Sequence, residues 1–123
     1  MRNPVRWFEI YVEDMNRAKA FYEKVFQLKL SQMHVGDELE MWGFPFDRER
    51  PGCTGTLVKM PGLKPSGIST VIYFGSEDCK VEERRILDCG GKVHKAKFSI
   101  GEYGFITLGF DTEGNMFGIH SQG

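Results

Sequence analysis

The feature that most constrains the fold of this chain is a strand-to-helix pattern that occurs twice. In the first copy, residues 7–12 alternate between two faces of a strand, and Asp14 follows where it can cap a helix. In the second copy, residues 71–74 form an apolar strand, and Glu77 or Asp78 can begin the next helix. Asp14 and Asp78 are 78 − 14 = 64 positions apart, and the same offset superimposes the apolar faces of the two strands. The chain is therefore predicted to contain two copies of one module.

Each copy continues with three further segments that are typical of strands. They fall at residues 28–34, 38–44 and 54–60 in the first copy and at 92–99, 103–110 and 115–120 in the second. We predict a single domain, residues 1–123, made of module one (1–60), a linker rich in Pro and Gly (61–67) and module two (68–123). The predicted fold class is α+β, with two βαβββ modules that form a curved, mostly antiparallel sheet around a cleft and carry helices on its outer face.

The first predicted helix carries apolar residues at spacings of three and four, which is the pattern of an amphipathic helix. It is expected to cover the strand face that carries Phe8, Ile10 and Val12. The helical residues expected to face that strand are Met15, Ala18, Phe21, Tyr22, Val25 and Phe26. At the end of the second helix, Gly90 and Gly91 are predicted to stop the helix.

Charge and cysteine content exclude several classes of function. The chain has 16 basic and 17 acidic residues, so no strong overall field attracts a nucleic acid or an anionic membrane. No apolar stretch is long enough to span a bilayer, and we expect a soluble, cytoplasmic protein with neither nucleic-acid nor membrane partners. The three cysteines are far apart and form no C-x-x-C pair, which argues against a disulfide framework and a zinc knuckle.

The most specific motif is D-x-x-G-N at residues 111–115, which predicts a tight turn into the last strand. Asp111 and Asn115 can hydrogen-bond the turn backbone, and Gly114 can adopt positive φ. Together with the strand-to-helix entry at 12–22, the segment 51–59, the Gly90-Gly91 pair and residues 101–104, this motif resembles the vicinal oxygen chelate superfamily. That superfamily comprises glyoxalases, bleomycin-resistance proteins and extradiol dioxygenases. The chain is most similar to its short glyoxalase-related group, whose last strand reads G-N-x-x-G-I/L-H/W.

The resemblance implies where a metal would bind. Catalytic members hold one divalent metal with His and Glu side chains from equivalent positions of the two modules. The positions that correspond to these ligands are Trp7, Val71, Gly118 and one of Glu40, Met41 and Trp42. Three of the four positions carry no metal ligand, and a lone Glu40 is too few because zinc sites need about three protein ligands. We therefore predict that the protein has no metal cofactor.

The predicted function is the binding of a small organic molecule in the cleft between the two modules, as in a metal-free relative of glyoxalases and bleomycin-resistance proteins. The residues predicted to line this site are Trp7, Glu9, Tyr11, Trp42, Tyr73 and His120. Gly118 is expected to leave room among these aromatic side chains. No catalytic residue is assigned, although Glu9 is a candidate general base because a carboxylate in an aromatic pocket can have a raised pKa. The other interpretation of Glu9 is a carboxylate paired with a nearby Arg or Lys.

Two alternatives remain open from the sequence. One is a metal-dependent lyase, isomerase or dioxygenase whose divalent metal is held by the non-standard set Glu9, Glu40 and His120. The other is a non-catalytic interaction protein whose cleft is filled by its own side chains or by a partner. The resemblance also implies a homodimer, because members of the superfamily commonly pair modules across a dimer interface.

Overall fold

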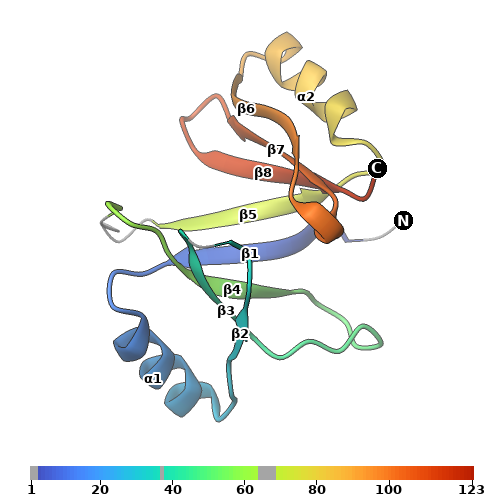
Figure 1. Cartoon of the computed structure of the whole chain (residues 1–123). Helices are drawn as coiled ribbons and strands as arrows, with labels where there is room; N and C mark the ends of the chain where they lie inside the picture. Colours follow the sequence, from blue (N-terminus) through green and yellow to red (C-terminus); the bar gives the residue numbers. More distant parts are fainter. Residues whose placement is uncertain (1–2, 37, 64–68) are drawn as a thin grey trace. The chain divides into compact units, whose positions relative to one another are not determined.

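The computed structural model describes residues 3–36, 38–63 and 69–123, and these residues have the predicted α+β architecture (Figure 1). They form eight strands, two α-helices and one short 3-10 helix. The chain divides into two compact units, which we call the first unit (Trp7–Thr70) and the second unit (Val71–Gly123 with Met1–Arg6). Residues 64–67 of the predicted linker lie outside the described residues. No helix in the described part of the chain is long and apolar enough to cross a membrane.

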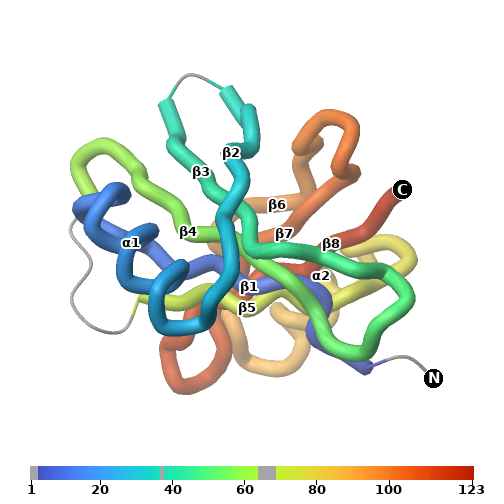
Figure 2. Tube along the Cα trace, turned by 90° about the horizontal axis from the view of Figure 1, so that it is seen from below, coloured from blue at the N-terminus to red at the C-terminus, as the bar shows by residue number. Residues whose placement is uncertain are grey.

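The first unit contains a four-stranded sheet with one helix. Its elements are β1 (Val5–Tyr11), whose first two residues belong to the second unit, α1 (Met15–Phe26), β2 (Ser31–Met33), β3 (Glu40–Gly43) and β4 (Thr54–Lys59). The strand order is β2-β3-β4-β1, with β1 and β4 parallel and the other pairs antiparallel. A long loop joins β3 to β4 (Figure 2). The predicted elements are confirmed, although β2 and β3 are shorter than the sequence indicated.

The second unit repeats this arrangement. Its elements are β5 (Thr70–Gly75), whose first residue belongs to the first unit, α2 (Cys79–Asp88), β6 (Lys92–Ser99), the 3-10 helix η1 (Gly101–Tyr103), β7 (Phe105–Phe110) and β8 (Met116–Ser121). The strand order is β5-β8-β7-β6, again with one parallel and two antiparallel pairs. The strand predicted from residue 103 begins instead at Phe105. The reason is that η1 precedes it and Gly104 turns the backbone with a φ of 107°.

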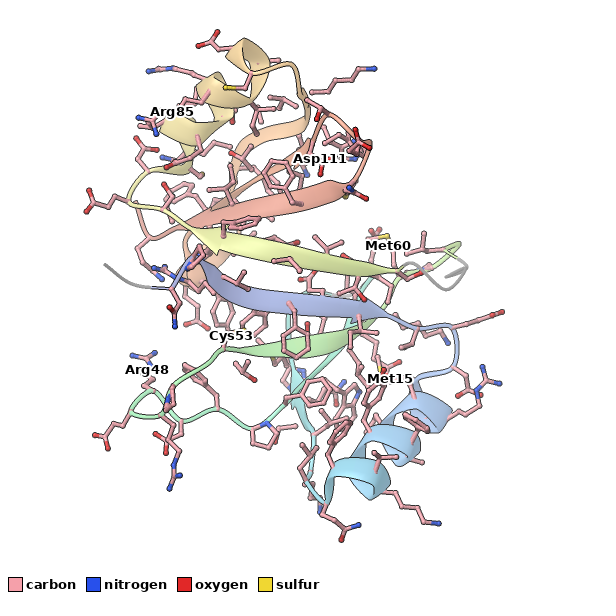
Figure 3. All side chains as sticks on the ribbon, turned by 180° about the vertical axis from the view of Figure 1, so that it is seen from behind. Met15, Arg48, Cys53, Met60, Arg85 and Asp111 are labelled. Atoms are coloured by element: carbon pink, nitrogen blue, oxygen red, sulfur yellow. The ribbon has the colours of Figure 1, made fainter. Side chains whose placement is uncertain are left out.

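Matching aspartates cap the two helices, as predicted. Asp14 accepts a hydrogen bond from the backbone N–H of Arg17 at 3.0 Å, and Asp78 accepts one from Lys80 at 3.0 Å. At the other end of α2, Gly90 has a φ of 90°, which confirms the glycine stop. The D-x-x-G-N turn is also confirmed, since Asp111 accepts hydrogen bonds from the backbone N–H of Glu113 at 2.8 Å and of Asn115 at 2.9 Å (Figure 3 marks Asp111).

The core of the first unit lies between α1 and the sheet, but α1 buries a narrower stripe than predicted. Met15 is buried with Leu30 and Leu57, and Figure 3 shows Met15 between α1 and the strands. Ala18 and Tyr22 pack against this cluster, so the buried stripe is Met15, Ala18 and Tyr22. The other α1 residues that were predicted to be buried are Phe21, Val25 and Phe26, which are 59%, 54% and 60% exposed. Phe21 lies one position before Tyr22, which turns its side chain about 100° around the helix from the buried stripe.

Candidate functional site

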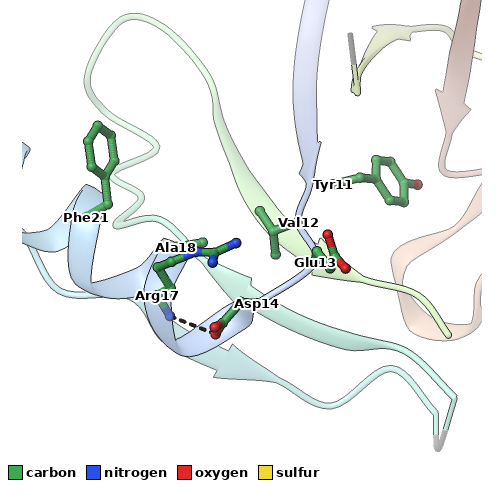
Figure 4. Close-up of a pocket in the computed structure, with 7 residues that line it drawn as sticks. All are labelled: Tyr11, Val12, Glu13, Asp14, Arg17, Ala18 and Phe21. Atoms are coloured by element: carbon green, nitrogen blue, oxygen red, sulfur yellow. Dashed lines mark hydrogen bonds between the residues drawn. The ribbon is translucent and has the colours of Figure 1, made fainter. Parts of the chain in front are cut away.

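The register of the first unit separates its sheet into two faces. On the face that α1 covers, Ile10 lies opposite Leu57, and Leu57 lies opposite Trp42. The neighbouring positions therefore point away from α1. They form two rows, Glu9 with Thr56 and Gly43, and Tyr11 with Val58 and Met41. Figure 4 shows the ring of Tyr11 directed away from α1.

Glu9 and Tyr11 form a hydrogen-bonded pair on the face away from α1. The Tyr11 hydroxyl donates to Oε1 of Glu9 at 2.8 Å. Burial raises the pKa of the Tyr11 phenol well above its ordinary value of 10.0, and the charge of Glu9 and this hydrogen bond raise it further. The phenol therefore stays protonated at neutral pH and acts as a donor, while Glu9 acts as an acceptor. This confirms that the two residues share a face, and the role of Glu9 as a general base stays a prediction.

Tyr11→Phe is expected to lower the free energy of unfolding by about 1.5 kcal/mol, because it removes a hydrogen bond to a carboxylate. Since the pKa of Tyr11 is higher in the folded protein, this contribution is fully present below pH 10.0 and falls as the pH rises above that value. Urea denaturation of both proteins at pH 7 and pH 10.5 measures the loss. Tyrosinate absorbance at 295 nm provides a further check. If the variant keeps the midpoint of the wild type and loses only the amplitude of one tyrosine, Tyr11 titrates like the other tyrosines, which would contradict the assignment.

Thr56 is the functional candidate that the sequence did not indicate. It has no exposed surface, and its hydroxyl has no hydrogen-bond partner among the described residues. It lies opposite Glu9 in the β1–β4 pairing. A threonine beside Leu57 and Val58 is an ordinary strand residue, so only the strand register reveals that it faces Glu9.

Trp42 lies on the other face from Glu9, because β3 pairs with β4 in a register that sets Trp42 opposite Leu57. The amino group of Lys19, on α1, is 3.2 Å from the centre of the Trp42 ring. The indole N–H of Trp42 donates to Oε2 of Glu40 at 3.0 Å. Trp42 and Glu40 thus belong to the α1 side of the first unit and do not join the pair formed by Glu9 and Tyr11.

The described residues do not fit a divalent metal. Glu9 and Glu40 lie on opposite faces of the same sheet and cannot bind one ion together. Three of the strand positions that carry metal ligands in catalytic members of the superfamily have no side-chain atom suited to bind a metal in this chain. These positions are Trp7, Val71 and Gly118. Within residues 3–36, 38–63 and 69–123, no three His, Cys, Asp or Glu side chains come close enough together to hold a metal.

In the second unit, Gly118 receives the ring of Tyr73. The two residues lie opposite each other in the β5–β8 pairing, and Tyr73 is only 6% exposed. A Cβ atom on residue 118 would overlap the Tyr73 ring carbons. The space that Gly118 was expected to leave is therefore filled by Tyr73, because a residue without a side chain allows a neighbouring ring to lie flat on the backbone.

His120 is held between Arg6 and the backbone of η1. Nη1 of Arg6 is 3.4 Å from Nδ1 of His120, and Nε2 of His120 contacts the carbonyl oxygen of Tyr103. Because a guanidinium can only donate, Nδ1 is the acceptor of the Arg6 contact, and Nε2 is the ring nitrogen that can donate to the Tyr103 carbonyl. Arg6 was not singled out from the sequence, since a lone arginine at the start of a strand carries no pattern.

Each unit has a shallow hollow among its described residues. The first has a volume of about 410 Å³ and is shown in Figure 4, with lining residues Tyr11, Val12, Glu13, Asp14, Arg17, Ala18 and Phe21. Its Asp14 carboxylate already caps α1. The second has a volume of about 370 Å³ between α2 and the sheet, with lining residues Phe74, Gly75, Glu82, Arg85, Ile86, Cys89, Phe117 and Ile119. Neither hollow is lined by all three of Glu9, Tyr11 and Thr56.

Comparison with known proteins supports the fold. The family model of the Glyoxalase/Bleomycin resistance protein/Dioxygenase superfamily matches residues 5–119. The methylmalonyl-CoA epimerase of Mycobacterium tuberculosis is similar, with a TM-score of 0.72 and 11% identity over 98% of this chain and 88% of that chain. A hypothetical protein of Bacillus halodurans has a TM-score of 0.73 and 9% identity, over 97% of this chain and 94% of that chain.

A further similar structure contains a ligand. It is a variant of the Streptomyces coelicolor methylmalonyl-CoA epimerase in complex with 2-nitronate-propionyl-CoA, with a TM-score of 0.70 and 17% identity over 99% of each chain. At such identities these similarities show the fold alone. No curated protein matches this chain.

Proposed function

Because the chain belongs to the Glyoxalase/Bleomycin resistance protein/Dioxygenase superfamily, we propose that it binds a small organic molecule without a metal ion. The observation that carries this proposal is the buried Thr56 hydroxyl, which has no hydrogen-bond partner among the residues that the structure describes and lies opposite Glu9. The binding surface is the face of the first unit that points away from α1. Trp7, Tyr73 and His120 stay predicted contacts of the ligand.

The chemistry of this face defines the complementary group on the ligand. A buried hydroxyl without a partner costs about 1–3 kcal/mol, so a ligand group that accepts from Thr56 recovers free energy. Because Thr56 has no exposed surface, the side chains that cover it must move for the ligand to reach it. Glu9 already accepts from Tyr11, and a carboxylate can accept several hydrogen bonds. A ligand hydroxyl or carboxamide, which both donates and accepts, would bind Glu9 and Thr56 together.

The absence of suitable donors at the family's ligand positions supports binding without a metal. Trp7, Val71 and Gly118 provide none, and Gly118 is required by the Tyr73 ring. The chemistry that a metal performs in catalytic relatives therefore has no equivalent donor set here. Elemental analysis of dialysed protein tests this point, and a stoichiometric divalent metal would overturn it.

A thermal-shift screen of small molecules tests ligand binding directly. A compound that binds the folded protein raises the unfolding midpoint in proportion to the logarithm of its concentration above Kd. Compounds with a hydroxyl or carboxamide on an aromatic or aliphatic body are expected among the hits. A screen without any concentration-dependent shift would favour the interaction-protein alternative.

Thr56→Val separates binding from stability. The free energy of unfolding of the variant is expected to equal that of the wild type or to exceed it by up to about 1 kcal/mol, because the substitution removes a buried hydroxyl that makes no described hydrogen bond. A ligand found by the screen is expected to bind it about tenfold more weakly, through the loss of one hydrogen bond of about 1.4 kcal/mol.

Thr54→Val is the matched control for this experiment. Thr54 is also buried in β4, but its hydroxyl donates to the carbonyl oxygens of Phe44 and Pro45 at 3.1 and 3.2 Å. Its replacement is expected to lower stability by about 1 kcal/mol and to leave ligand affinity unchanged. Equal losses of affinity in the two variants would contradict a direct role for Thr56.

A further inference from the structure

We propose that Arg6, in the second unit, binds a carboxylate or phosphate group of a small molecule. The inference rests on the proposed binding of a small organic molecule and identifies one chemical group that such a molecule carries. Its evidence is independent of Thr56, because it comes from the second unit, where Arg6, Gly75 and His120 lie together.

The backbone leaves space for the Arg6 side chain beside Gly75. The N–H of Gly75 donates to the carbonyl of Pro4 at 3.0 Å, which holds the start of β1 beside the end of β5. A Cβ on residue 75 would lie 2.9 Å from Nε of Arg6, so the guanidinium group occupies the space that a side chain at this position would fill. Gly75 lies opposite His120, and Arg6 therefore reaches the His120 ring.

The charge of Arg6 has no counterpart in the described part of the chain. Other partly buried cations of this unit are paired, such as Lys80 with Glu83 at 2.7 Å and Lys97 with Asp78 at 2.8 Å. Arg6 is partly buried and has no described carboxylate within ion-pair distance. Its side-chain hydrogen bond goes to Nδ1 of His120 at 3.4 Å and uses one of its five N–H donors.

An anion is the group that complements this arrangement. The planar guanidinium matches the two oxygens of a carboxylate or phosphate, and such charge-assisted hydrogen bonds are about twice as strong as neutral ones. His120 is a positioning residue, since Nδ1 accepts from Arg6 and Nε2 is fixed by the Tyr103 carbonyl. The remaining Arg6 donors are thereby left for a ligand.

The test measures the binding of sodium propionate and of inorganic phosphate, each at constant ionic strength set with sodium chloride. The readouts are the unfolding midpoint and the NMR shifts of the His120 ring. In the wild type, at least one of the two anions is expected to raise the midpoint and to shift the His120 signals saturably. Comparison of the two anions shows which oxyanion the ligand carries.

Three variants identify the residue responsible. Arg6→Gln is expected to bind the anion at least tenfold more weakly, and Gly75→Ala to weaken binding because the added methyl displaces the guanidinium while its charge remains. Arg48→Gln removes an exposed loop arginine and is expected to change nothing (Figure 3). Equal anion affinity in the wild type and Arg6→Gln, or no saturable anion binding to the wild type, would overturn the inference.

A failure of the anion inference can be distinguished from a failure of the proposed function. A screening hit whose affinity depends on Thr56 and is unchanged in Arg6→Gln would leave the proposed function standing and overturn the anion inference. Saturable anion binding that depends on Arg6, without any compound that depends on Thr56, would support the anion site and overturn the proposed binding surface of the first unit.

Discussion

Glu83→Ala is expected to destabilise the second unit by about 3 kcal/mol, because it removes a buried carboxylate that accepts three hydrogen bonds and opens a cavity in its place. Glu83 is 6% exposed, and Oε1 accepts hydrogen bonds from the backbone N–H of Lys97 at 2.6 Å and the Thr107 hydroxyl at 3.0 Å. Oε2 accepts from the amino group of Lys80 at 2.7 Å. Alanine leaves a cavity and removes the acceptor of all three donors, two of which come from β6 and β7. Urea denaturation at pH 7 measures the loss.

A second comparison, between the wild type and Glu83→Gln, has a pH dependence of defined sign. Burial raises the pKa of Glu83, but the hydrogen bonds from Lys80, Lys97 and Thr107 outweigh it and hold the pKa below the ordinary value of 4.5. A carboxyl with a lowered pKa in the folded state stabilises fully above its unfolded pKa, and this stabilisation is lost as the pH falls through the folded pKa. The difference in unfolding free energy between the wild type and Glu83→Gln should therefore shrink below pH 4.5.

Glu77→Ala is the control, because Glu77 is exposed and precedes the same helix. Its replacement is expected to change the free energy of unfolding by less than about 0.5 kcal/mol. If Glu83→Ala unfolds at the same urea concentration as Glu77→Ala, the network does not hold α2 to β6 and β7. A change in m-value in either variant would indicate an altered unfolded state, and thermal unfolding would then replace urea.

Gly118→Val is expected to destabilise the protein by about 3 kcal/mol, because overpacking a buried site forces side chains out of their preferred rotamers. The Tyr73 ring lies on the backbone of residue 118 and has little free space in which to move. Gly118 has no positive φ, so the predicted loss comes from contact with the ring and not from backbone strain. Thermal and urea unfolding both measure the effect.

A double-mutant cycle with Tyr73→Ala isolates this contact. Tyr73→Ala alone costs stability because it opens a cavity. In that background, Gly118→Val is expected to cost at least 1 kcal/mol less than in the wild type, about the coupling energy of residues in contact. Additive losses in the double variant would mean that Gly118 is needed for a reason other than the Tyr73 ring.

Local features of the sequence determined most of the secondary structure. The caps at Asp14 and Asp78 and the Asp111 turn all act through side chains that bond backbone groups within four residues. Such interactions depend on neighbouring residues alone, so they can be recognised without the fold. Alternation in the first strand likewise predicted correctly that Glu9 and Tyr11 share a face, because side chains alternate along every strand.

Only the tertiary structure decided which groups meet across strands and how far each helix is covered. Trp42 lies on the α1 face because β3 pairs with β4 in one register, and a shift of one residue would have reversed its side. The same kind of pairing sets Thr56 opposite Glu9, and the approach of Pro4 to Gly75 places Arg6 beside His120. These pairings join residues far apart in the sequence. They depend on the packing of the whole unit, and no local pattern encodes them.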